Sequence, residues 1–311
     1  MCGGRVAMPI CARLANQMPR VAYPACRARS RVCRFDHRSD GRNALRFGRE
    51  SRERGEGNMQ LTLAMTTLQR ISITKADLDR IPLNERRNVI LLAHAANELN
   101  TFSRLFRFTL RQPDADDVVM QAHGAQTLAI ARVLASKAWE TWQLLSKGFL
   151  SSATAKTYEA QFSDDDKASF NAVKKYFKGG SPFSRIRNKL GFHYDLDAID
   201  KGYANLQPSD DLNAYISKYH TNTFYAFAET VAGHTMLELV CPGDPQKAFQ
   251  ILIGDMEEMA GTLAEVTSAI IAACLEIHCG DVRTSKREII PLKDAPDAQS
   301  ITIPFFVTVP D

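Results

Sequence analysis

Apolar residues recur every three or four positions along two long stretches of this chain, residues 84–111 and 115–149. That spacing places them on one face of an α-helix, so each stretch predicts a long amphipathic helix. Pro113-Asp114 ends the first helix and begins the second. We therefore predict two long antiparallel helices at the centre of a helical bundle. The apolar positions are Val89, Leu92, Ala96, Leu99, Phe102, Phe106 and Leu110, then Val118, Leu128, Val133, Trp139, Trp142 and Leu145.

Signals at the ends of helices mark the rest of the bundle. Ser163 precedes three aspartates, which suit the positive end of a helix dipole, and this helix ends at Gly179-Gly180. Ser181-Pro182 is an N-cap followed by a proline at the first helical position. We expect further helices at 195–206, 224–240 and 245–279, and extended structure at 213–220 and 301–309. The predicted fold class is all-α, a helical bundle with long antiparallel helices, a short extended segment and a C-terminal strand-like tail.

Residues 1–58 differ sharply in composition from the rest of the chain. They hold 13 arginines, no lysine and five acidic residues, a net charge of +8, whereas the remaining 253 residues hold 26 basic and 30 acidic groups, a net charge of −4. They also lack an apolar period, so they cannot bury enough surface to offset the entropy cost of ordering. We expect a disordered leader that lies upstream of a natural start at Met59. A transit peptide and a basic RNA-binding arm are the alternatives. A helical domain at 59–290 and an extended tail at 291–311 follow.

Cysteine usage and hydropathy favour a cytoplasmic protein. Beyond the leader the chain has Cys241, Cys274 and Cys279, an odd number with no Cys-x-x-Cys pair, so neither a disulfide framework nor a zinc ribbon is expected. No uninterrupted apolar run approaches the roughly 18–20 residues that span a bilayer, so we expect no membrane partner.

One segment, residues 184–195, contains the candidate catalytic residues. It contains Arg187, the polar Asn188 directly after it, and His193 six positions after the arginine. This Arg-x(4–6)-His pattern resembles the HEPN family. The resemblance covers about a dozen residues. It implies a helical bundle, a homodimer and, in many members, a metal-independent ribonuclease of toxin–antitoxin or phage-defence systems that needs no cofactor. RNA and an antitoxin protein are then the expected partners.

The residue types suit RNA cleavage without a metal. Histidine titrates near neutral pH and can move the 2′-hydroxyl proton, while the guanidinium fork matches phosphate oxygens. By resemblance, His193 is the acid/base, Arg187 the phosphate ligand and Asn188 the residue that orients them. Arg185, Lys189 and Tyr194 are the candidate substrate-binding residues. The product would carry a 2′,3′-cyclic phosphate.

Helix geometry leaves an alternative open. Six residues along a regular α-helix leave Arg187 and His193 about 120° apart. They converge if Arg187 reaches round, if the helix loosens near Gly191, or if a second subunit supplies one group. Otherwise the motif is structural, and the chain is a non-catalytic helical interaction or dimerisation protein.

Other candidate sites have weaker signals. Three pairs at i, i+4 spacing could each supply two metal ligands, but we expect no metal site, because the sequence beyond the leader contains no Glu-x-x-His. We expect Trp139 and Trp142 to belong to the core. The basic run that would contact RNA comprises Lys174, Lys175, Lys178, Arg185, Arg187 and Lys189. The metal pairs are His94/Glu98, His234/Glu238 and Cys274/His278.

Overall fold

The structure is a computed structural model that describes residues 66–111, 115–191, 195–210, 212–280, 287–292 and 295–308. The leader, residues 1–58, lies outside these ranges, and so does the expected start at Met59. Within them the chain is mainly helical, with a small two-stranded sheet, as the predicted fold class requires.

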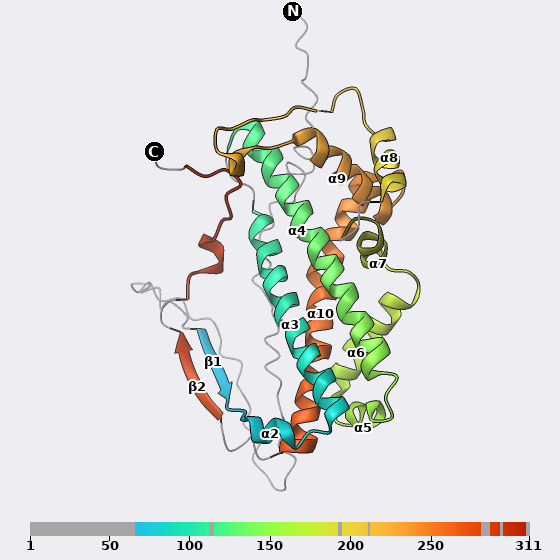
Figure 1. Cartoon of the computed structure of the whole chain (residues 1–311), viewed down its shortest axis with the longest axis vertical. Coiled ribbons are helices and arrows are strands. Elements are labelled where there is room, and N and C mark those ends of the chain that lie inside the picture. Colours follow the sequence, from blue (N-terminus) through green and yellow to red (C-terminus); the bar gives the residue numbers. More distant parts are fainter. Residues whose placement is uncertain are drawn as a thin grey trace, which may run out of the picture.

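Three long helices run side by side along the long axis of the molecule (Figure 1). They are α3 (Leu83–Thr109), α4 (Asp117–Gln143) and α10 (Pro245–Cys279), and a π-helical turn, Leu144–Phe149, extends α4. The antiparallel pair expected from the apolar period is therefore confirmed as α3 and α4. Leucines at the centre of these helices, such as Leu92, Leu134 and Leu252, are fully buried. Each contributes roughly 1.5–3 kcal/mol by leaving water.

Helix α10 combines length with high hydropathy. An 18-residue window of it has a mean hydropathy of 1.5, so by length and composition it is the one described helix that could cross a membrane. Half of that window is buried inside the bundle, against α3, α6, α9 and α4. Since half of this window packs against four other helices, α10 belongs to the core of the bundle.

Shorter helices surround the long ones, and several begin where the sequence predicts. Ser163 and Asp166 form a capping box at the start of α6 (Asp164–Lys178), and Ser181 caps α7 (Pro182–Ile186). Asp195 caps α8 (Leu196–Ala204), which packs against α9 (Ala226–Val240). Two short helices, α2 (Lys75–Asp79) and α5 (Ala155–Glu159), were not predicted.

The sheet joins the first regular element of the described chain to the strand that follows α10. Strand β1 (Thr66–Ile71) pairs antiparallel with β2 (Arg287–Leu292), with Leu68 opposite Ile290, beside the α2 end of the bundle (Figure 1). The sequence does not predict this pairing, because neither short segment identifies its partner. The two expected extended segments behave differently: 213–220 forms a single bridge, Tyr215 to Phe224, and 301–308 contains no strand residue and bends at 305–306.

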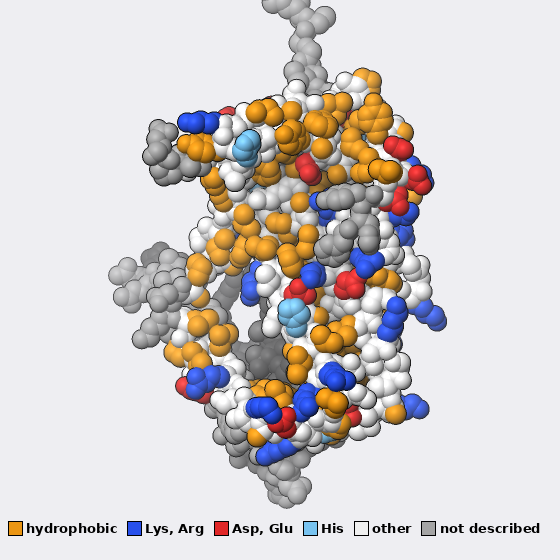
Figure 2. Space-filling model, in the orientation of Figure 1, with side chains coloured by type: hydrophobic (Ala, Val, Ile, Leu, Met, Phe, Trp, Pro, Cys, Tyr) orange, Lys and Arg blue, Asp and Glu red, His pale blue; other side chains and the backbone are white. Residues whose placement is uncertain are grey.

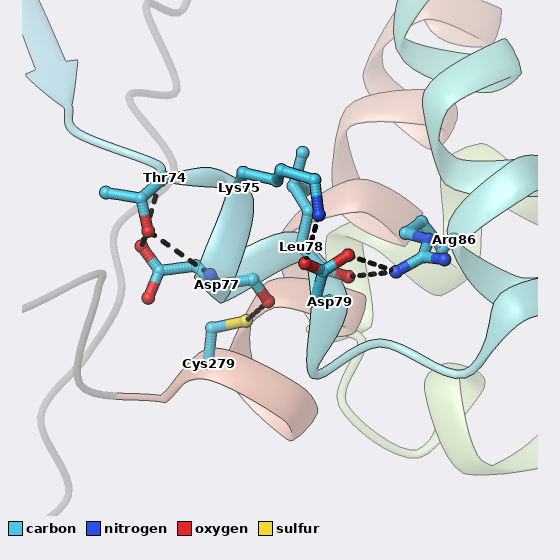
Figure 3. Close-up of polar contacts among 7 residues, drawn as sticks. All are labelled: Thr74, Lys75, Asp77, Leu78, Asp79, Arg86 and Cys279. Carbon is cyan, nitrogen blue, oxygen red and sulfur yellow. Dashed lines mark hydrogen bonds and ion pairs between the residues drawn. The ribbon is translucent and has the colours of Figure 1, made fainter.

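Helix α2 fastens the start of α3 to the end of α10 (Figure 3). Thr74 and Asp77 form a capping box, and the thiol of Cys279 donates to the Asp77 carbonyl at 3.1 Å. On the other side of α2, Asp79 accepts from Lys75 at 2.5 Å and from Arg86 of α3 at 2.8 Å. These contacts tie three segments together at one end of the bundle.

Candidate functional site

The motif segment begins as α7 and continues as a π-helical turn, Arg187–Gly191. Phe183, Ile186 and Leu190 are buried, so α7 and the turn are anchored on α4. Gly191 sits so close to α4 that a Cβ would overlap Ser136 Oγ and lie 3.2 Å from Ser136 Cβ. The π-helical turn is wider than an α-helix, so the angle expected from regular helix geometry does not apply here.

The structure brings Arg187 and Asn188 together. Arg187 Nε donates to Glu140 Oε1 of α4 at 2.6 Å, and Nη1 donates to Asn188 Oδ1 at 3.2 Å. The Arg187 side chain is 30 % exposed and that of Glu140 is 45 % exposed. An anion that approached Arg187 would therefore compete with a carboxylate on the same surface.

Arg185 forms hydrogen bonds to backbone carbonyls. Its guanidinium donates to the carbonyls of Leu239 at 2.6 Å, Gly180 at 2.7 Å and Val240 at 3.3 Å. Leu239 and Val240 form the last turn of α9, whose carbonyls have no partner within the helix. Gly180 has φ +78°, a left-handed conformation that glycine favours. Arg185 therefore holds the end of α9 to the turn before α7.

Lys189 is paired within the segment. Its Nζ lies 2.6 Å from Asp195 Oδ2. The hydrogen bond with Asp195 raises the pKa of Lys189, and the bond with Lys189, together with one from the Ala198 amide, lowers the pKa of Asp195. Because Asp195 also caps α8, this pair links the π-helical turn to the next helix.

Two predicted site residues, His193 and Tyr194, lie outside the described residues, and so does Phe192. The acid/base role of His193 and the substrate contact of Tyr194 therefore stay predictions.

The basic run expected to contact RNA has fewer unpaired cations than the sequence suggests. Lys174 Nζ lies 3.7 Å from Glu159 and 3.8 Å from the ring centroid of Phe170. Lys175 and Lys178 are exposed. Four of the six cations in the run, Lys174, Arg185, Arg187 and Lys189, are thus bonded to carboxylates or carbonyls of their own chain.

A second polar cluster joins α3, α5 and α10, and the sequence did not reveal it. The Tyr158 hydroxyl donates to Glu85, and His278 Nε2 lies 3.0 Å from the same Glu85 oxygen and 3.3 Å from the Tyr158 hydroxyl. Burial, and then the Glu85 carboxylate, raise the pKa of Tyr158. Burial also raises the pKa of the nearby Cys274 thiol to about 11. Tyr158 is 2 % exposed, and the side chains of His278 and Glu85 are 18 % and 17 % exposed, so the cluster fastens the helices with its phenol buried.

In two of the candidate metal pairs, the carboxylate bonds to another group. Glu98 accepts from Lys137 at 2.5 Å, and Glu238 accepts from the Gly243 amide at 3.0 Å. His234 is buried, with Nε2 3.3 Å from Asp210 Oδ2. Across the part of the chain that the structure describes, no group of three or more His, Cys, Asp or Glu side chains could hold a metal ion.

Trp139 and Trp142 pack on Phe177 at 5.9 and 5.2 Å between ring centroids. They border the core, as predicted.

Comparison with known proteins adds no relative. No protein-family model matches the chain, and no curated protein or solved structure is significantly similar to it.

Proposed function

We propose that the chain is a non-catalytic helical interaction protein that forms a homodimer through the surface of α8 and α9. The observation that carries this proposal is a group of large apolar side chains that the bundle leaves in water. On α8, Leu196 is 77 % exposed and Tyr203 is 66 % exposed, and their i, i+7 spacing puts them on one helical face. Tyr225 and Phe227, at the start of α9, are about half exposed.

These side chains belong to one end of the molecule. Figure 2 shows hydrophobic side chains gathered over the end where α8 and α9 lie. The exposed Asp200 shares the α8 face with Leu196 and Tyr203. Large apolar side chains gathered in water at one end of a protein are a feature of interaction sites, and aromatic residues are enriched at such sites. In this proposal the motif is structural, because Arg185, Arg187 and Lys189 hold α7, the π-helical turn and α8 in place.

The test replaces the exposed face of α8. Leu196→Glu combined with Tyr203→Glu should convert a dimer to a monomer in light scattering after size exclusion. The melting temperature of the monomer should change little, since neither side chain is buried. Ile289→Glu is the matched control, because Ile289 is 67 % exposed but lies on β2. A parent chain that is monomeric at high micromolar concentration contradicts the proposal.

A metal-independent endoribonuclease is the second candidate. It is favoured by the partly exposed Arg187–Asn188 pair, which precedes His193 as in the HEPN pattern. An exposed ion pair contributes only about 0–1 kcal/mol, so an RNA phosphate could displace Glu140 from Arg187. His193 would then take the 2′-hydroxyl proton while the 2′-oxygen attacks phosphorus. The 5′-oxygen would leave and take up a proton from water, and the strand would end in a 2′,3′-cyclic phosphate.

RNA cleavage in EDTA separates the two candidates. If the chain is a ribonuclease, His193→Ala should lower cleavage by roughly 10²–10⁴-fold. Arg187→Ala should lower it comparably. Glu140→Gln should raise RNA affinity, because it frees Arg187 from its carboxylate. Lys175→Ala is the control for loss of a nearby positive charge. A parent chain that leaves RNA intact, with all four variants folded, excludes the ribonuclease and leaves the interaction protein.

A further inference from the structure

The C-terminal segment lies on a small apolar cluster separate from the main core. Phe224 is 2 % exposed and packs with the buried Ala122, Ala125 and Ala226. Tyr215 stacks on Phe224 with ring centroids 6.0 Å apart. The three alanines leave room for large rings above them, and the chain's own tail fills that room.

Two consecutive aromatic residues of the tail cover this cluster. The ring of Phe305 lies 5.0 Å from that of Phe224, and the ring of Phe306 lies 6.4 Å from it. The two tail rings meet edge-on at 5.0 Å. Along the segment, Ile301 and Ile303 are partly buried while Thr302 and Pro304 are exposed, the alternation of an extended peptide with one face on a surface.

One side chain binds the backbone of the tail at two points. Asn222 Nδ2 donates to the Val307 carbonyl at 2.7 Å, and the Val307 amide donates to Asn222 Oδ1 at 3.0 Å. The side-chain amide thus takes the place of a neighbouring strand. These two bonds are the hydrogen bonds that hold residues 301–308 to other described parts of the chain. The Val307 side chain is 47 % exposed, so Asn222 recognises the backbone of this residue and not its side chain.

We infer that Asn222, Phe224 and Tyr215 form a peptide-binding slot that the tail occupies in its own chain, and that the slot accepts the same tail from a second copy. Among the described residues, only a few ring contacts and two hydrogen bonds hold the segment, on a cluster separate from the main core, so it can leave while the bundle stays folded. Backbone pairing gives affinity and the two aromatic rings give specificity, as when an extended peptide adds to a sheet edge. The tail of a second copy meets both requirements, since it is the same peptide.

The test uses the full chain and a fluorescent peptide with the sequence of residues 301–311. The wild-type slot should exclude the peptide below about 100 µM, because a short tether holds the chain's own tail at an effective concentration on the order of 1 mM. Phe305→Ala combined with Phe306→Ala should free the slot, so that fluorescence anisotropy shows binding at least tenfold stronger than to wild type. A peptide carrying both alanines should not bind. Adding Asn222→Ala to the freed chain should weaken binding by roughly tenfold.

Leu196→Glu in the freed chain is the control. It alters the α8 surface and should leave peptide binding unchanged. The peptide-slot inference can therefore be refuted while the dimer proposal stands, and the dimer proposal can be refuted while the slot inference stands. If the double alanine variant does not fold, Val307→Pro replaces it. This variant keeps both rings but lacks the amide that donates to Asn222, and it should also admit the peptide. A folded variant that does not bind the peptide overturns the inference. Unfolding of both variants also overturns it, since the tail would then be an obligatory part of the fold.

Discussion

Gly191→Ala combined with Ser136→Ala tests how the motif segment is held on α4. A Cβ at Gly191 would overlap Ser136 Oγ, which is fully buried and donates to the Arg132 carbonyl at 2.8 Å. Forcing extra atoms into such a contact costs about 1–3 kcal/mol. Ser136→Ala alone removes one hydrogen bond, worth about 0.5–1.5 kcal/mol, and gains part of this back through alanine's higher helix propensity. Ser136→Ala also removes Oγ, the oxygen that a Cβ at residue 191 would overlap.

The double variant should therefore be more stable than Gly191→Ala alone. Once Oγ is gone, the remaining contact to the Cβ of residue 136 is 3.2 Å, which needs a shift of only a few tenths of an ångström. We expect a coupling free energy of about 1–2 kcal/mol, measured by urea unfolding of the four members of the cycle. Gly254→Ala in α10 is the control, because no side chain and no backbone beyond its own helical turn lies within 4 Å of the added Cβ, and it should stabilise by up to about 1 kcal/mol. Additive effects of the two substitutions would refute the close contact between α7's π-helical extension and α4.

Three further predictions concern polar side chains that bond to other helices or are buried. Burial lowers the pKa of His123 below its usual 6.5. The unfolded chain therefore binds this proton more readily than the folded chain. The contribution of neutral His123 to the unfolding free energy should be fully present above about pH 6.5 and be lost as the pH falls toward the folded-state pKa. His123→Gln should reduce this pH dependence in urea titrations from pH 7 to 5. Tyr158→Phe should cost about 1–2 kcal/mol in urea unfolding, because Glu85 loses a donor. The control for it, Tyr203→Phe at an exposed site, should stay within about 0.5 kcal/mol. Arg185→Lys should lower the unfolding free energy by about 1–3 kcal/mol, since an ammonium cannot reach three carbonyls as a planar fork does; an unchanged melting curve would contradict this.

Local signals predicted the parts of the fold that local physics determines. Ser163 with Asp166, and Ser181 with Pro182, identify helix starts because the caps bond to amides only three residues away. The apolar period located α3 and α4 for the same reason.

Contacts between distant segments were not predictable in this way. Glu140 is 47 residues from Arg187, and Glu85 is 73 residues from Tyr158. No spacing rule joins such residues before the bundle packs. The sequence thus located Arg187 and Asn188 as a pair but gave no sign of the carboxylate that accompanies them. His193, the other half of the motif, stays a prediction.

The pairing of β1 with β2 has a consequence for synthesis on the ribosome. The two strands are separated in the chain by everything between Ile71 and Arg287. At typical elongation rates of about 5–20 residues per second, β1 waits on the order of ten seconds or more for its partner. During that time the bundle helices can already pack, while the backbone groups of β1 lack the strand that later satisfies them. A message truncated before codon 287 would yield a chain in which β1 has no partner strand. The unpaired backbone groups of β1 could then pair with other nascent chains and cause aggregation, or expose the chain to quality-control proteases.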